Sequence, residues 1–151
     1  MSDLFTVRVY GIMINEKKQV LVSDEHIRGG LYTKFPGGGL EFGEGTLECM
    51  VREWKEEINQ DIEVVEHLYT TDFFQMNAFN NKQQIIAIYY LVKGISPFNI
   101  HTGSKPFDFE LPDDPMVQIE GVRWIDWEDF TEEAITLPTD KRVTKIVKER
   151  F

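Results

Sequence analysis

Three glutamates crowd one side of a predicted helix. At about 100° per residue, Glu53, Glu56 and Glu57 lie within about 100° of one another on a helix spanning residues 46–58. Glu53 and Glu57 stand four residues apart and repel by roughly 0.2–0.5 kcal/mol on an isolated helix, and Arg52 offsets only part of this repulsion. Such an acid cluster predicts a bound cation. Its carboxylate oxygens suit Mg²⁺ or Mn²⁺ better than Zn²⁺ or copper.

Two elements must position these acids: a glycine-rich loop and the buried face of the helix. Residues 35–45 contain five glycines and lead directly into the helix. They lack the Gly-Lys-Ser/Thr ending of a nucleoside-triphosphate loop. We expect Cys49 to be a half-buried structural thiol rather than a nucleophile. The helix should bury one apolar stripe, made of Leu47, Met50, Val51, Trp54 and Ile58.

The spacing of the glycines and acids resembles the Nudix box, Gly-x5-Glu-x7-Arg-Glu-(apolar)-x-Glu-Glu-x-Gly-(apolar), here at residues 38–60. Asn59 replaces the usual glycine, and Gln60 replaces an apolar residue. Asparagine tolerates a left-handed helix end, so we expect the cap to be kept. Gln60 predicts slightly looser packing after the helix. Six fixed positions match in type and spacing: Gly38, Glu44, Arg52, Glu53, Glu56 and Glu57.

The resemblance to the Nudix (MutT-like) hydrolase family implies a fold and a set of residue roles. The fold would be an α/β/α sandwich with a mixed sheet, formed by residues 1–151 as a single domain. Arg52 would orient the carboxylates, and Glu44 would hold Arg52 or a water at the metal. Glu53 and Glu57 would be the foremost direct metal ligands, and Glu56 would be either a ligand or the catalytic base, an assignment that varies among family members. The implied metal ligands are Glu53, Glu56, Glu57 and the carbonyl of Gly37.

Other charged residues are candidates for binding substrate or a further metal ion. Arg8, Arg28 and Lys34 could contact substrate phosphate, although each is more often plain surface. A further acidic ligand often comes from a distant loop in this family. The acidic candidates here are Glu110, Asp113, Asp114 and Glu120.

The rest of the chain reads as strands separated by turns, followed by helices. Residues 94–115 contain four prolines and little periodicity, so we expect a long loop or insertion there. A short helix is expected at residues 127–134 and a last helix at 141–150. Strands are expected at residues 4–14, 19–23, 31–35, 62–75, 84–92 (central) and 117–125, with a hairpin turn at 15–18, a loop at 24–30 and a turn at 76–82.

Composition limits the partners and the compartment. The chain has 151 residues and a formal net charge of −10, which argues against nucleic acid as a bulk partner. It has no apolar run of membrane-spanning length and no basic-then-apolar leader. The single cysteine cannot form an internal disulfide. These features predict a cytoplasmic protein with a small nucleotide as its partner, and the family resemblance favours a homodimer.

The predicted function is metal-dependent hydrolysis of a pyrophosphate bond in a nucleoside diphosphate linked to another group X. The substrate could be a nucleoside triphosphate or a nucleotide sugar such as ADP-ribose, and the short chain mildly favours the former. An alternative is a Nudix module that senses a nucleotide without cutting it. A prenyl diphosphate isomerase is more remote, because Cys49 lies inside the box helix.

Overall fold

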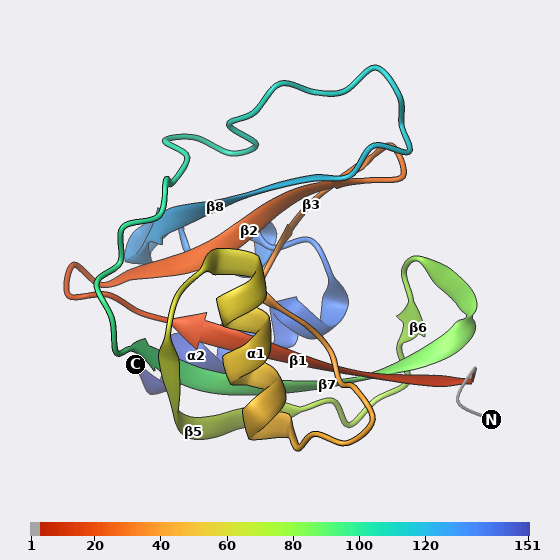
Figure 1. Cartoon of the computed structure of the whole chain (residues 1–151), viewed down its shortest axis with the longest axis horizontal. Helices are drawn as coiled ribbons and strands as arrows, with labels where there is room; N and C mark the ends of the chain where they lie inside the picture. Colours follow the sequence, from red (N-terminus) through yellow and green to blue (C-terminus); the bar gives the residue numbers. More distant parts are fainter. Residues whose placement is uncertain (1–3) are drawn as a thin grey trace. The chain divides into compact units, whose positions relative to one another are not determined.

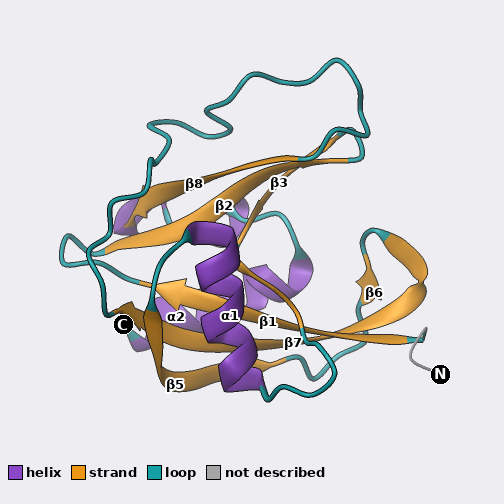
Figure 2. Cartoon of the chain, in the orientation of Figure 1, coloured by secondary structure: helices purple, strands orange, loops and turns teal. Residues whose placement is uncertain are grey.

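The computed structural model describes residues 4–151, which form two compact units. The first unit comprises residues 4–12 and 36–98, and the second comprises residues 13–35 and 99–151. Each unit is therefore built from two separate stretches of the chain. Figure 1 traces these stretches by colour, and Figure 2 shows that each unit contains both strands and helix. None of the helices within residues 4–151 is both long enough and apolar enough to cross a membrane.

The first unit contains a mixed sheet. The pairs β1–β4, β5–β7 and β6–β7 are antiparallel. The neighbours β1 and β7 run in the same direction, as their arrows show in Figure 1. Strand β7 lies inside the sheet, as its apolar sequence predicts. The order is β4 (Gly37–Gly39), β1 (Phe5–Met13), β7 (Asn80–Gly94) and β5 (Ile62–Thr70), with β6 (Met76–Asn77) paired to β7.

Helix α1 (Thr46–Ile58) has the predicted bounds but buries a different face. Leu47 is 54% exposed and Val51 is 43% exposed, so the prediction that both are buried was wrong. Cys49 is fully buried rather than half-buried. The buried stripe is rotated around the helix because Cys49 and Glu53 lie inward in place of Leu47 and Val51. It consists of Cys49, Met50, Glu53, Trp54 and Ile58.

The two departures from the Nudix box have physical explanations at the end of α1. Asn59 adopts the left-handed conformation (φ 57°, ψ 37°) and caps the helix, as predicted. Gln60 is 1% exposed. Its Nε2 donates to the carbonyl oxygens of Asp61 and Ser96, both at 3.0 Å. The expectation of looser packing was therefore wrong, because Gln60 is buried and its hydrogen bonds to Asp61 and to Ser96, after β7, replace the apolar contact.

The second unit contains an antiparallel three-stranded sheet in the order β3 (Gly30–Lys34), β2 (Gln19–Ile27) and β8 (Ile119–Asp126). Two 3-10 turns, η1 (Trp127–Asp129) and η2 (Glu132–Ala134), replace the predicted single short helix. Helix α2 (Pro138–Arg150) begins three residues before the predicted start, with proline in its first turn.

The pairing or the length of three strands differs from the sequence prediction. Strands β1 and β2 belong to different sheets, so the predicted hairpin was wrong. The turn between them is closed by the bridge Ile14–Val20 and by hydrogen bonds between Asn15 and Gln19. Strand β2 continues through residues 24–27, which were expected to be loop. Its polar side chains can be buried because β3 and β8 supply partners for them. Strand β5 ends at Thr70 rather than residue 75 and contains two irregularities of register.

The long segment after β7 contains no named helix or strand between residues 95 and 118, as predicted. It is nevertheless held to the second unit's sheet by three hydrogen bonds. The Gly103 amide donates to the Val122 carbonyl at 2.9 Å. The Phe107 amide donates to Asp24 Oδ2 at 3.1 Å. The Val117 carbonyl lies 2.8 Å from Nδ1 of His26.

Candidate active site

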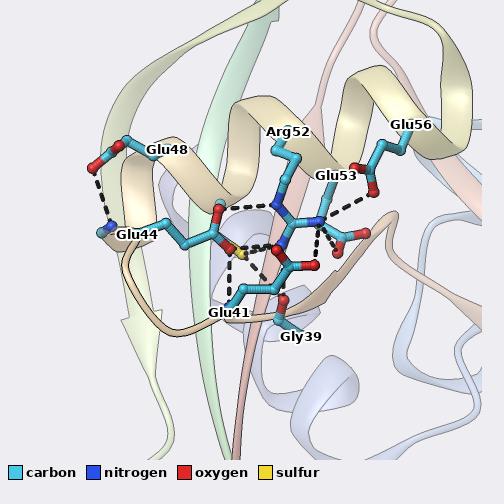
Figure 3. Close-up of polar contacts among 9 residues, drawn as sticks. Gly39, Glu41, Glu44, Glu48, Arg52, Glu53 and Glu56 are labelled. Atoms are coloured by element: carbon cyan, nitrogen blue, oxygen red, sulfur yellow. Dashed lines mark hydrogen bonds and ion pairs between the residues drawn. The ribbon is translucent and has the colours of Figure 1, made fainter.

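Arg52 is the centre of the polar cluster on α1 (Figure 3). Its Nη2 and Nε donate to the two carboxylate oxygens of Glu44 at 2.6 and 2.9 Å. Its Nη2 also donates to the carbonyl oxygen of Gly39 at 3.0 Å. The planar guanidinium matches a carboxylate with two parallel hydrogen bonds, which fixes its orientation as well as its position. Arg52 thus joins the glycine-rich loop to the helix that follows it.

The remaining nitrogen of Arg52 faces three more acids. Nη1 donates to Glu53 Oε1 at 3.0 Å and to Glu56 Oε2 at 3.1 Å. Glu41 Oε1 lies 3.5 Å from the same nitrogen. Hydrogen bonds from Arg52 and from the Glu41 amide lower the pKa of Glu44 to about 2. Four carboxylates therefore share one guanidinium, and the negative charge of the cluster exceeds its positive charge.

Glu53 is the buried member of this cluster, at 8% exposure. Its carboxylate packs directly against the backbone of Gly38, where a Cβ atom would lie only 2.3 Å from Oε2. Burial raises the pKa of Glu53, and the charges of Glu57 and Glu56 raise it further, while Arg52 opposes both effects. A carboxylate in this environment is stabilised by a nearby cation.

The donors present fit a hard divalent cation. They are carboxylate oxygens and backbone carbonyls, the ligands that Mg²⁺ prefers. The glycine at position 38 creates the space that the Glu53 carboxylate fills. Glu56 and Glu57 are exposed and can rearrange. Within residues 4–151, no three His, Cys, Asp or Glu side chains already converge in the arrangement of a metal site.

Two other predicted residues lie in the glycine-rich strand β4 and beside it. Gly37 pairs with Tyr10, and Arg8 pairs with Gly39, across the β1–β4 ladder. The Nε atom of Arg8 donates to the Tyr10 hydroxyl at 3.1 Å, and its guanidinium lies 5.8 Å from the ring centroid. Arg8 is therefore next to the strand that carries Gly38.

The remaining predicted residues belong to the second unit. Arg28 is exposed in the turn between β2 and β3 and has a left-handed backbone (φ 49°). Lys34 is 6% exposed and forms an ion pair with Glu25 at 3.5 Å, so the expectation of plain surface was wrong for this residue. The four candidate acidic ligands, Glu110, Asp113, Asp114 and Glu120, also lie in this unit.

Sequence reasoning missed several partners in these networks. Glu41, in the glycine-rich loop, was not among the predicted site residues, although it faces Arg52 at 3.5 Å. The thiol of Cys49 donates to the Gly39 carbonyl at 3.6 Å, and burial raises its pKa to about 12. In the second unit, Arg123 forms two hydrogen bonds with Asp24, at 2.7 and 3.0 Å. No sequence spacing links Asp24 to Arg123, because they meet only through the pairing of β2 with β8.

A family model described as NUDIX domain matches residues 4–145. The chain belongs to the Nudix family. This membership makes it a pyrophosphohydrolase, and it confirms the fold class and the enzyme class predicted from the box. The model spans most of both units, including the long segment at residues 95–118.

Several solved structures share this fold. The solution structure of the Escherichia coli ORF135 protein has a TM-score of 0.69 at 15% identity. The match covers 98% of this chain and 91% of the ORF135 chain. A MutT protein from Methanosarcina mazei has a TM-score of 0.66 at 15% identity, and the match covers 99% of this chain and 97% of the MutT chain. An ADP-ribose pyrophosphatase from Streptococcus suis has a TM-score of 0.55 at 13% identity, and the match covers 97% of this chain and 92% of the pyrophosphatase chain. No curated protein sequence matches the chain.

Proposed function

We propose that this Nudix enzyme hydrolyses a pyrophosphate bond in a small nucleotide and depends on Mg²⁺ or Mn²⁺. The observation that carries the proposal is the buried Glu53 carboxylate, which sits against Gly38 beside two more glutamates and a single arginine. Neutralising a diphosphate requires positive charge, and the described cluster has an excess of acid. A divalent cation would supply that charge.

The residues proposed to hold the cation are Glu53, Glu56, Glu57 and the carbonyl of Gly37. When bound, a divalent ion supplies Lewis-acid stabilisation of phosphate oxygens and lowers the pKa of water. The two hydrogen bonds between Arg52 and Glu44 fix the guanidinium, which in turn orients the neighbouring carboxylates.

The proton released by the attacking water needs an acceptor. Glu53 and Glu56 are both proposed for that role. Glu53 is held firmly by its contact with Gly38, whereas the exposed Glu56 is held only by Arg52 within the cluster. Among the predicted substrate contacts, Arg8 is proposed to bind phosphate because it lies beside the glycine strand. Arg28 and Lys34, the other two predicted phosphate contacts, belong to the second unit and stay predictions.

Two substrate classes fit this chemistry: nucleoside triphosphates and nucleotide sugars such as ADP-ribose. A MutT protein and an ADP-ribose pyrophosphatase both share the fold, so the fold favours neither class. The compartment proposed is the cytoplasm, where the buried thiol of Cys49 stays reduced.

The experiment is a substrate panel of nucleoside triphosphates, nucleotide sugars and dinucleoside polyphosphates, with Mg²⁺ or with excess EDTA. At least one compound should be cleaved, and EDTA should stop its turnover. Cleavage that continues in EDTA would contradict the metal dependence. Tight nucleotide binding without cleavage of any compound would contradict the proposed activity and favour a sensor.

A further inference from the structure

Two consecutive side chains of α1 rest on glycines of neighbouring strands. Glu53 lies against Gly38 of β4, and Trp54 lies against Gly11 of β1. A Cβ atom at Gly11 would lie 2.6 Å from Nε1 of the indole and 3.0 Å from its Cε2 and Cζ2 atoms. Gly11 follows Val9, the partner of Gly38 in the β1–β4 ladder, by two residues, so both glycines belong to the same face of the sheet. At the turn that carries Glu53, α1 therefore lies closer to the sheet than a larger residue at position 11 would allow.

The indole of Trp54 has little freedom to move. It is the largest fully buried side chain among residues 4–151, at 0% exposure. Its Nε1 has no hydrogen-bond partner within that part of the chain, so packing rather than a hydrogen bond fixes the ring. Protein interiors are close-packed and transmit small displacements instead of absorbing them. A change in the spacing between β1 and the ring must therefore be passed to the backbone of α1.

The residues at positions 11 and 54 are matched in size. The Nudix box specifies only an apolar residue at position 54, and this chain has tryptophan, the largest of them. Gly11 has no left-handed backbone angle, so backbone strain does not require glycine there. What requires glycine is the space that the indole occupies.

We propose that Trp54 is a positioning residue, whose indole on Gly11 sets the place of the Glu53 carboxylate on Gly38. The inference rests on the proposed function, in which Glu53 holds the cation. Ordinary contacts begin near 3.4 Å, so a methyl group on Gly11 displaces the ring by about 0.8 Å. Glu53 directly precedes Trp54 and moves with it. Oxygen ligands of Mg²⁺ lie at about 2.0–2.1 Å in near-ideal octahedral geometry, so a shift of this size disturbs the site.

The test is a double-mutant cycle between the two positions. Gly11→Ala adds the methyl group, Trp54→Leu removes the three ring atoms that face Gly11, and a third variant combines both changes. At saturating Mn²⁺, kcat should fall by on the order of 10- to 100-fold in each single variant, because either the clash or the void displaces Glu53. The combined variant should recover most of this loss, because alanine fills space that leucine leaves. The loss should appear in kcat rather than KM, because the displaced group is a metal ligand.

The matched control is Gly94→Ala. Its Cβ would lie 2.9 Å from Nε2 of Gln60, beyond the end of the same helix, so it strains α1 at a distance from Glu53. This variant should have a lower melting temperature and wild-type kcat. A crystal structure of metal-free Gly11→Ala gives a readout that does not depend on activity. It should show the Glu53 carboxylate displaced from Gly38, whereas Gly94→Ala should keep that contact. Thermal melts establish that each variant is assayed in its folded state.

Three outcomes would overturn the proposal. One is wild-type kcat in a folded Gly11→Ala or, if that variant does not fold, in Trp54→Leu. Another is a combined variant no more active than Gly11→Ala. The third is a Gly94→Ala that loses as much kcat as Gly11→Ala, because the effect would then be general destabilisation. If the wild type binds no Mn²⁺ and cleaves no substrate, the proposed function fails, and the place of Glu53 in the metal-free crystal still decides whether Trp54 positions it.

Discussion

Replacing Gly38 with alanine isolates the contact that positions Glu53. Gly38 has no left-handed backbone angle, so alanine fits its main chain. The new Cβ would lie 2.3 Å from both Cδ and Oε2 of Glu53, whereas ordinary contacts begin near 3.4 Å. The carboxylate must therefore move by about 1 Å. Misplacing a catalytic group by this distance costs on the order of 100-fold in rate. The fold should survive, because the group that must move is the end of a flexible side chain.

The neighbouring glycines provide matched controls. At Gly39 the nearest atom to a new Cβ is Arg8 Nη1 at 3.5 Å, an ordinary contact, so Gly39→Ala should keep near wild-type turnover. At Gly37 the new Cβ would lie 2.1 Å from the Val9 carbonyl oxygen, a backbone atom that cannot move freely. Gly37→Ala should therefore lose stability by about 1–3 kcal/mol or more.

The assay combines turnover of the best panel substrate with thermal melting of all three variants. The expected pattern is an inactive but folded Gly38→Ala, an active Gly39→Ala and a destabilised Gly37→Ala. Wild-type turnover in Gly38→Ala would refute the argument, because it would mean that the position of Glu53 does not matter. A Gly38→Ala variant as unstable as Gly37→Ala would refute the claim that Glu53 moves aside.

Three further predictions concern other groups. Because burial raises the pKa of Glu53, its ionised form lowers stability above that pKa, and the cost disappears as the pH falls through it. Metal-free Glu53→Gln should melt above the wild type in alkaline buffer, with a gap that closes on acidification; equal melting temperatures at high pH would contradict this. Cys49 is buried with a pKa of about 12, so alkylation, followed by mass spectrometry, should be negligible until the protein unfolds. Asp24→Ala leaves Arg123 without its buried partner and should lower the free energy of unfolding in urea by about 3–5 kcal/mol. Glu63→Ala, which breaks the exposed ion pair with Lys93, should lower it by less than about 1 kcal/mol.

Local signals predicted α1 well. The acid spacing, the preceding glycines and the left-handed Asn59 set both ends of the helix. Apolar periodicity failed to identify the buried face, because it treats Leu47 and Val51 as core and Glu53 as surface. The buried carboxylate depends on Gly38 lying opposite it, and the pairing of β4 with β1 places that glycine there.

Strand pairing was the least predictable part of the fold. The turn at residues 15–18 was identified correctly, but spacing alone could not show that β1 and β2 join different sheets. The end of β2 was expected to be loop because Asp24 and Glu25 are charged. Both are buried because Arg123 and Lys34 come from distant positions in the sequence. Long-range partners of this kind leave no local signal.

Direct measurement of cation binding tests the central claim most sharply. Mn²⁺ can be titrated into wild type, Glu57→Gln and Glu48→Gln, and its free fraction followed by electron paramagnetic resonance. Glu48 lies on the same helix but accepts the Gly45 amide at its start, a bond that glutamine keeps. Wild type and Glu48→Gln should bind Mn²⁺ and cleave substrate, while Glu57→Gln should lose both. A wild type that binds no Mn²⁺ even with substrate analogue, or a fully active Glu57→Gln, would contradict the account.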